Sequence, residues 1–253
     1  MIKLELSDKP KKLTEKVQKR LTKEFINSGK KKVVWKYKYI YEEVRKIAFG
    51  KCSFSEINLD TKSTYTEIEH FFPKDLYPNK VVEWGNLLPS SKKCNTTKGD
   101  TDTVKDKIVN PLIDNPKEHL YFENFRLYPK DSSNIGRNTI LTVALNDRLH
   151  FVNPRSEQSL MVLDFMDAFY EDYIETDELK KLNGIKLSNR INRIKGILSS
   201  INRKTEFSAC IATAVIDSPN YIEIISYLKN NDFWDIEFQS YEEELSFCYL
   251  GKQ

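Results

Sequence analysis

Long apolar runs are missing from this sequence of 253 residues. The first residues, Met1 to Leu6, lack the apolar stretch of a signal peptide, and no run of about 18 apolar residues is available to span a bilayer. We therefore expect a cytoplasmic protein that does not enter a membrane.

Cysteine is also scarce. The four cysteines are too few and too scattered to form a disulfide framework, so reduced thiols are expected. They stand at Cys52, Cys94, Cys210 and Cys248. The sequence thus gives no indication of redox chemistry or of a small secreted domain.

A large net charge of one sign is absent as well, because 40 Lys and Arg face 37 Asp and Glu, for a formal net charge of +3. The charge is nevertheless uneven along the chain. Residues 1–110 carry 24 Lys and Arg against 15 Asp and Glu, whereas the remainder carries 16 against 22. A basic segment attracts phosphate backbones without reading their sequence. Two solvated surfaces of opposite sign would give the same counts.

What is present is the composition of a folded protein, with 40% hydrophobic residues, 30% charged residues, 14 Phe and 13 Tyr. The length suits one domain or two closely packed ones. Three regions are predicted: a basic helical region at 1–50, a central region at 51–155, and a helical region at 156–253 that is a candidate for docking a partner.

Helical periodicity is clear on both sides of the central region. An amphipathic helix is predicted over 11–26, and a second over 34–49 that Gly50 would close. Residues 120–128 have the aromatic content of a strand or hairpin. Further helices are predicted at 136–149, at 156–173, along the apolar stripe of 187–201, and from Pro219 onward.

The segment 64–99 carries the densest group of chemically informative residues. A strand over 64–69 should stop near Pro73, and residues 84–89 are typical of a short returning strand. Ser90 or Ser91 can then cap a helix through 95–98, with Gly99 just past its end. The predicted order is strand, loop, strand, helix.

Three side chains of this segment suit phosphodiester hydrolysis. Glu69 offers a carboxylate oxygen and Asn95 an amide oxygen, a ligand set for one hydrated Mg²⁺ or Mn²⁺. His70, with an ordinary pKa of about 6.5, can take a proton from an attacking water. Neighbours on a strand point to opposite faces, so Glu69 and His70 share a site only if the strand ends or bends there.

The residues Ile68 to Lys74, Trp84 to Leu88 and Cys94 to Gly99 closely resemble the ββα-metal core of HNH endonucleases. The resemblance implies that His70 is the general base, that Glu69 and Asn95 hold the metal, and that Asn86 holds the loop and orients the histidine. It also implies a phosphate contact for Lys98. Lys74 is a further candidate for a phosphate contact, although an exposed lysine after proline is more often solvated.

The similarity extends more loosely to about residue 155. The branch it resembles contains the nuclease subunit of Septu-type and retron-associated phage-defence systems, which is usually paired with a separate ATPase. Many relatives hold the core with two Cys-x-x-Cys pairs that bind structural zinc, but here Ser55 and Ser91 replace one cysteine of each pair. The remnant of Cys52 and Cys94 lacks two of the four ligands, so no structural zinc is predicted.

The sequence therefore predicts an α+β protein, mainly helical, with an embedded HNH core and a helical C-terminal region. The expected function is that of a metal-dependent endonuclease acting as the effector of an anti-phage defence complex with an ATPase partner. Its specificity is expected to come from the partner or from nucleic-acid structure, because phosphate contacts alone do not read a base sequence. DNA is the default substrate, and RNA is an alternative. Two other hypotheses remain: a catalytically weak module that binds nucleic acid or a partner, and a stand-alone restriction-type nuclease.

Overall fold

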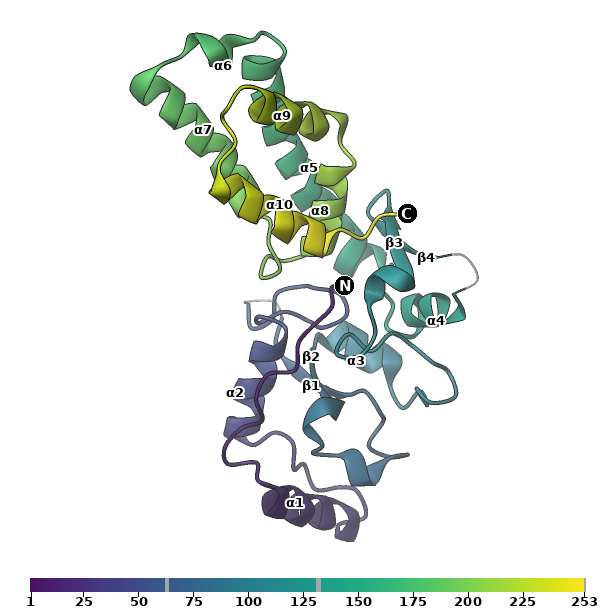
Figure 1. Cartoon of the computed structure of the whole chain (residues 1–253). Coiled ribbons are helices and arrows are strands. Elements are labelled where there is room, and N and C mark those ends of the chain that lie inside the picture. Colours follow the sequence, from purple (N-terminus) through teal and green to yellow (C-terminus); the bar gives the residue numbers. More distant parts are fainter. Residues whose placement is uncertain (62–63, 131–132, 253) are drawn as a thin grey trace. The chain divides into compact units, whose positions relative to one another are not determined.

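The computed structural model describes residues 1–61, 64–130 and 133–252. Helices dominate these ranges, and the strands that they contain form two antiparallel pairs (Figure 1). The predicted α+β class is therefore confirmed. None of the helices in these ranges is both long enough and apolar enough to cross a membrane.

The chain divides into two compact units. The first contains residues 1–121 and 126–151, and the second contains residues 122–125 and 152–253. The predicted basic region 1–50 is part of the first unit, together with the segment 64–99. The candidate site therefore lies entirely within one unit.

The first unit begins with two helices, α1 at Glu15–Asn27 and α2 at Lys38–Ile47. Helix α1 starts four residues later than predicted because Thr14 caps it, its hydroxyl accepting the backbone N–H of Val17 at 3.3 Å. Helix α2 also starts later than predicted, and the predicted closure at Gly50 is confirmed. Gly50 has φ +78° and donates its N–H to the carbonyl of Arg45 at 2.9 Å.

The predicted order of strand, loop, strand and helix is confirmed in the centre of this unit. Strand β1 at Glu67–His70 pairs with β2 at Leu87–Ser90, with Glu69 opposite Leu88. Helix α3 follows at Lys92–Lys98, between the predicted caps. The Ser91 hydroxyl accepts the N–H of Cys94, and Gly99 ends the helix at φ +50°.

The loop between the two strands differs from the prediction at its end. Residues Trp84–Asn86 form a 3₁₀ turn, η2, where the sequence predicted the returning strand, and a second turn, η1, spans Pro78–Lys80. The Trp84 indole donates to the carbonyl of Ser7 at 2.7 Å, which ties the turn to the N-terminal segment. The strand therefore begins only at Leu87.

The remainder of the first unit includes the turn η3 at Pro116–Glu118, helix α4 at Asn134–Thr142 and the π-helix η4 at Arg148–Val152, whose last residue falls in the second unit. The predicted hairpin is present as β3 at Leu120–Glu123 and β4 at Arg126–Pro129, and its residues 122–125 are assigned to the second unit. The helix predicted over 136–149 is interrupted at Ala144, which adopts φ +51°.

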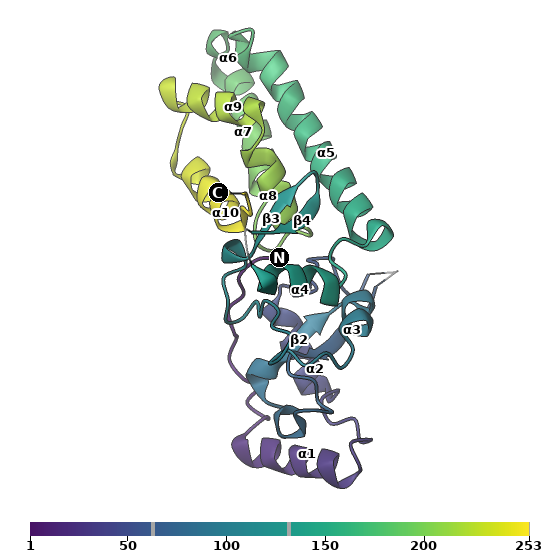
Figure 2. The same ribbon diagram turned by 90° about the vertical axis from the view of Figure 1, so that its right-hand side faces the viewer.

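The second unit is helical. Its elements are α5 at Asn153–Phe169, the π-helix η5 at Tyr170–Ile174, α6 at Glu178–Lys181, α7 at Gly184–Ser199, α8 at Ser208–Ile216, α9 at Pro219–Asn230 and α10 at Ile236–Cys248. Helix α8 is almost entirely buried and packs against α5, α9 and α10 (Figure 2). It forms the core of this unit, and the predicted helical start at Pro219 is confirmed.

Candidate functional site

A cavity of about 230 Å³ in the first unit collects most of the predicted site residues. Glu69 and His70 from β1, Asn95 from α3, and Lys74 all line it. Strand β1 ends at His70. Because the strand stops there, the neighbouring Glu69 and His70 both reach one cavity, as the sequence required of a shared site.

The imidazole of His70 is held in one orientation. Its Nε2 lies 3.0 Å from the carbonyl oxygen of Val81, and its ring meets the Trp35 ring edge to face at 4.9 Å between centroids. A carbonyl only accepts, so Nε2 carries the hydrogen when the ring is neutral and Nδ1 carries the lone pair. Burial lowers the pKa of His70 to about 4. The ring is therefore neutral at neutral pH.

Glu69 is paired with Lys98 inside the protein. Its Oε1 lies 2.7 Å from the Lys98 Nζ, which also donates to the carbonyl of His70 at 2.9 Å. Burial raises the pKa of Glu69 to about 7, and the Lys98 ammonium opposes that rise. Lys98 is itself buried. A phosphate contact for this lysine remains a prediction, and it requires the ammonium to leave Glu69.

Lys74 lies closer to solvent than Lys98. Its side chain is 30% exposed, and its Nζ stands 3.4 Å from Asp75 Oδ2 and 5.7 Å from the centre of the Trp35 ring. It lines the cavity, so its ammonium can reach an anion there. Its phosphate contact also remains a prediction.

Asn86 bridges the two ends of the loop between the strands. Its Oδ1 accepts the N–H of Phe72 at 2.7 Å, and its Nδ2 donates to the carbonyls of Phe72 and Lys80 at 3.1 and 2.9 Å. The side chain is completely buried. Lys80 directly precedes Val81, whose carbonyl receives the His70 ring. These bonds therefore fit the positioning role that the sequence predicted for Asn86.

The amide of Asn95 has a partner that sequence reasoning missed. Its Nδ2 donates to Oε2 of Glu67, which also lines the cavity. Residues two apart on a strand point to the same face, so the alternation of Glu67 with Glu69 was a usable signal. The hydrogen bond turns the Asn95 nitrogen toward Glu67 and leaves its oxygen for another ligand.

The donor set suits a hard cation. Among the residues that the structure describes, no three His, Cys, Asp or Glu side chains are grouped as they are around a tightly held metal ion. The cavity instead offers carboxylate oxygens of Glu67 and Glu69 and the amide oxygen of Asn95. Such oxygens fit Mg²⁺ or Mn²⁺, which retain several water ligands.

The predicted remnant of a zinc site is gathered in one place. The thiols of Cys52 and Cys94 lie within interaction distance of each other and of Ser55 and Ser91. The Cys52 Sγ lies 3.8 Å from Ser90 Oγ, and the backbone N–H of Cys94 donates to Ser91 Oγ at 3.3 Å. Both cysteines are buried, and burial raises the pKa of the Cys94 thiol. Two hydroxyls stand where a closed zinc site needs two further thiolate or imidazole ligands. The expectation of no structural zinc remains a prediction.

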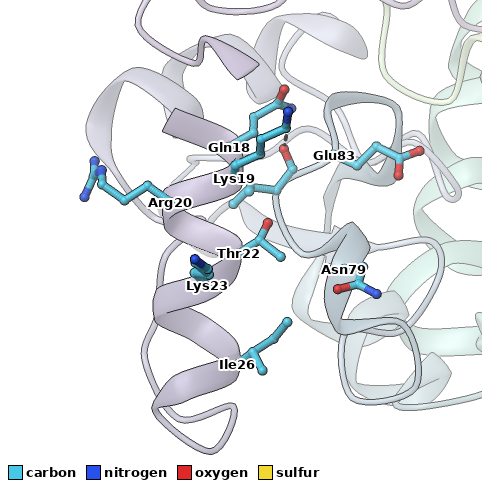
Figure 3. A pocket seen from close by; sticks show the side chains of 9 residues that line it. Gln18, Lys19, Arg20, Thr22, Lys23, Ile26, Asn79 and Glu83 are labelled. Carbon is cyan, nitrogen blue, oxygen red and sulfur yellow. Dashed lines mark hydrogen bonds between the residues drawn. The ribbon is translucent and has the colours of Figure 1, made fainter. Parts of the chain in front are cut away.

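A second, larger cavity of about 590 Å³ lies between α1 and the segment 79–83. Figure 3 shows Lys23 on the helix and Asn79 and Glu83 on the opposite side. Gln18 spans the gap by donating to the carbonyl of Val82 at 2.9 Å, the dashed line in Figure 3. The lining contains a single carboxylate and no imidazole or thiol. This cavity is therefore a poorer candidate for hydrolytic chemistry.

Comparisons with known proteins place the chain in a family. No family model matches it. Septu protein PtuB from Bacillus thuringiensis is 33% identical over 239 residues, which cover 94% of this chain and 91% of that protein. Septu protein PtuB from Bacillus mycoides (strain KBAB4) is 29% identical over 136 residues, or 42% of this chain and 46% of that protein. The chain belongs to the Septu PtuB family.

Proposed function

We propose that this protein is a metal-dependent HNH endonuclease that hydrolyses phosphodiester bonds in nucleic acid. One observation carries the proposal. A neutral, oriented imidazole, that of His70, lines the same cavity as the oxygen ligands of Glu69 and Asn95. A proton acceptor beside a set of hard oxygen ligands is the arrangement that metal-assisted hydrolysis needs.

His70 would act as the general base. The bond from Nε2 to Val81 fixes the tautomer, so the lone pair of Nδ1 is the acceptor for a proton of the attacking water. The edge of Trp35 and the loop held by Asn86 keep the ring in place. No rotation of the ring is then needed for the proton transfer.

Glu69 and Asn95 would hold one Mg²⁺ or Mn²⁺, with Glu67 orienting the Asn95 amide. The bound ion would polarise the phosphodiester and stabilise the leaving oxygen. Lys98 keeps a positive charge beside Glu69, which favours the ionised carboxylate in a buried position. The products expected of an HNH enzyme are a 5′-phosphate and a 3′-hydroxyl.

We further propose that the protein is the effector nuclease of a Septu anti-phage defence complex, with a separate ATPase subunit as its partner. Membership of the PtuB family supports this role. In the second unit, helix α5 exposes Leu160, Met161 and Phe165, which are 47%, 54% and 48% exposed. Exposed apolar side chains on one helix support a docking role for that unit.

A catalytically weak binding module is the second candidate. The observation that favours it is the buried ion pair of Glu69 with Lys98, because a lysine already neutralises the carboxylate that would hold the metal. In that case the cavity would bind nucleic acid without turning it over. His70 would then serve only to pack the loop.

Cleavage of plasmid DNA and cellular RNA by the purified chain, with Mg²⁺ or Mn²⁺ and with EDTA, separates the two candidates. His70→Ala should abolish metal-dependent cutting, whereas His150→Ala is the matched control. His150 belongs to the first unit, and its side chain is 55% exposed and pairs with Asp147. Equal cutting by the wild type and His70→Ala would contradict the assignment of the base.

A further inference from the structure

We propose that residues 30–39, here named the basic-aromatic strip, bind an unpaired nucleic-acid strand beside the candidate site. In this arrangement Lys36 contacts a phosphate near the cleavage point and Tyr37 stacks on a base. The inference rests on the proposed nuclease function and deepens it. It names the substrate class as single-stranded or locally unpaired nucleic acid.

The composition of the strip is the first observation. Residues 30–39 contain five lysines, Trp35 and two tyrosines, and no acidic residue. Sites for single strands combine cationic side chains that follow the backbone with aromatic rings that stack on bases. This segment interleaves both kinds of side chain within ten residues.

Position is the second observation. Trp35 and Lys36 line the same 230 Å³ cavity as Glu69 and His70. Trp35 is buried against the His70 ring, which anchors the strip at the site. Lys36 follows it directly and is exposed. A strand with its reacting phosphate in the cavity would therefore pass Lys36.

The distribution of ion pairs identifies the cations that are available. Lys32 pairs with Glu24 at 2.6 Å, Lys38 reaches Glu42 at 3.7 Å, and Lys30 donates to a backbone carbonyl. For Lys36 no carboxylate lies within ion-pair distance in the described part of the chain. Among the described lysines that line the cavity, Lys36 can thus take a phosphate without breaking an ion pair, whereas Lys74 lies 3.4 Å from Asp75.

The tyrosines supply the stacking surface. The rings of Tyr37 and Tyr39 are stacked, with centroids 5.8 Å apart and planes at 16°. Tyr37 is 39% exposed. Because its ring is already ordered by its neighbour, a base that stacks on it pays little for immobilising the side chain. Bases inside a duplex are paired and stacked, so an unpaired strand is the form that the ring can engage.

The test measures binding by the full chain in EDTA, where metal-dependent cleavage does not occur. Fluorescence anisotropy is recorded for a labelled mixed-sequence oligonucleotide, single-stranded and annealed to its complement. Tyr37→Ala should weaken single-strand binding roughly 5- to 150-fold, the range that follows from about 1–3 kcal/mol per stacked base. Tyr37→Phe keeps the ring and should bind like the wild type. Duplex binding should be weaker and insensitive to Tyr37→Ala.

Lys36→Ala tests the phosphate contact. It should lower affinity and reduce the salt slope of single-strand binding by about 0.7, the value for one phosphate contact. The matched control is Lys23→Ala, an exposed lysine of the 590 Å³ cavity (Figure 3). Equal losses for the two variants would overturn the location of the contact. A circular dichroism spectrum like that of the wild type shows that each variant is folded.

Other outcomes also decide the matter. Unchanged single-strand binding by Tyr37→Ala, or tighter binding of the duplex, would overturn the inference. So would equal competition by polyglutamate, which would indicate an acidic protein partner. If His70→Ala abolishes cleavage while Tyr37→Ala has no effect on binding, strand binding by the basic-aromatic strip is contradicted and the proposed nuclease function is supported. If Tyr37→Ala weakens binding while His70→Ala still cuts, strand binding by the basic-aromatic strip is supported and the proposed role of His70 in cleavage fails.

Discussion

Glu69 and His70, two buried titratable groups of the site, should make opposite contributions to the pH dependence of stability. The pKa of His70 is lowered from 6.5 to about 4, so between these values the unfolded chain binds a proton that the folded chain does not. Stability from this group therefore rises with pH across that window. The pKa of Glu69 is raised from 4.5 to about 7, so the folded chain binds the extra proton and stability falls with pH.

The contributions of His70 and Glu69 to the unfolding free energy are similar in magnitude. Each shift corresponds to about 3 kcal/mol of unfolding free energy across its full window, at about 1.4 kcal/mol per pH unit. The windows overlap between pH 4.5 and 6.5. In the wild type the two contributions should nearly cancel there. Single substitutions should expose each contribution separately.

Denaturant unfolding at a series of pH values, followed by the fluorescence of Trp35 and Trp84 in the first unit, measures the unfolding free energy of each variant. Relative to the double variant, Glu69→Gln keeps only the His70 contribution and should gain stability as pH rises from about 4 to 6.5. On the same scale His70→Ala keeps only the Glu69 contribution and should lose stability as pH rises from 4.5 to about 7. The double variant should run parallel to the wild type between pH 4.5 and 6.5, where the two contributions nearly cancel. Parallel curves for the wild type and both single variants would contradict the two pKa shifts, because neither group would then titrate differently in the folded and unfolded chain.

Three further predictions concern the residues around this pair. Asn86→Ala should lower the unfolding free energy by about 3 kcal/mol or more in denaturant titrations. The substitution leaves the part-buried N–H of Phe72 and the part-buried carbonyl of Lys80 without the hydrogen bonds that the Asn86 amide now makes. Glu67→Ala should weaken Mn²⁺ binding roughly tenfold in electron paramagnetic resonance titrations, because Asn95 loses the group that orients it; unchanged affinity would contradict that role. Lys98→Met should shift the acidic limb of the pH–rate profile to higher pH, because the pKa of Glu69 rises further without the ammonium; an unmoved limb would count against it.

The succession of strand, loop, strand and helix at the site was predictable because the residues that limit each element lie within or next to that element. Pro73 limits the first strand, Ser91 caps the helix and Gly99 ends it, and each acts through the backbone of its own segment. That order alone brings Glu69 and Asn95 to one cavity. The α+β class followed from the same kind of evidence.

Features that depend on distant contacts were not predictable. Trp35 packs on a histidine 35 positions later, and no local pattern indicates that contact. Lysine is rarely buried, so the burial of Lys98 follows only from its tertiary pairing with Glu69. The interruption of the predicted 136–149 helix occurs at Ala144, a residue type that rarely adopts positive φ.

We propose that the cavity of Glu69, His70 and Asn95 cuts nucleic acid with a divalent metal. The most direct measurement is cleavage of plasmid DNA and cellular RNA by the chain co-purified with the proposed ATPase subunit, across increasing Mn²⁺, for the wild type, His70→Ala and His150→Ala. Metal-dependent cleavage that His70→Ala abolishes and His150→Ala retains is the expected result. An absence of cleavage by the wild-type complex, or cleavage that survives His70→Ala, would contradict it.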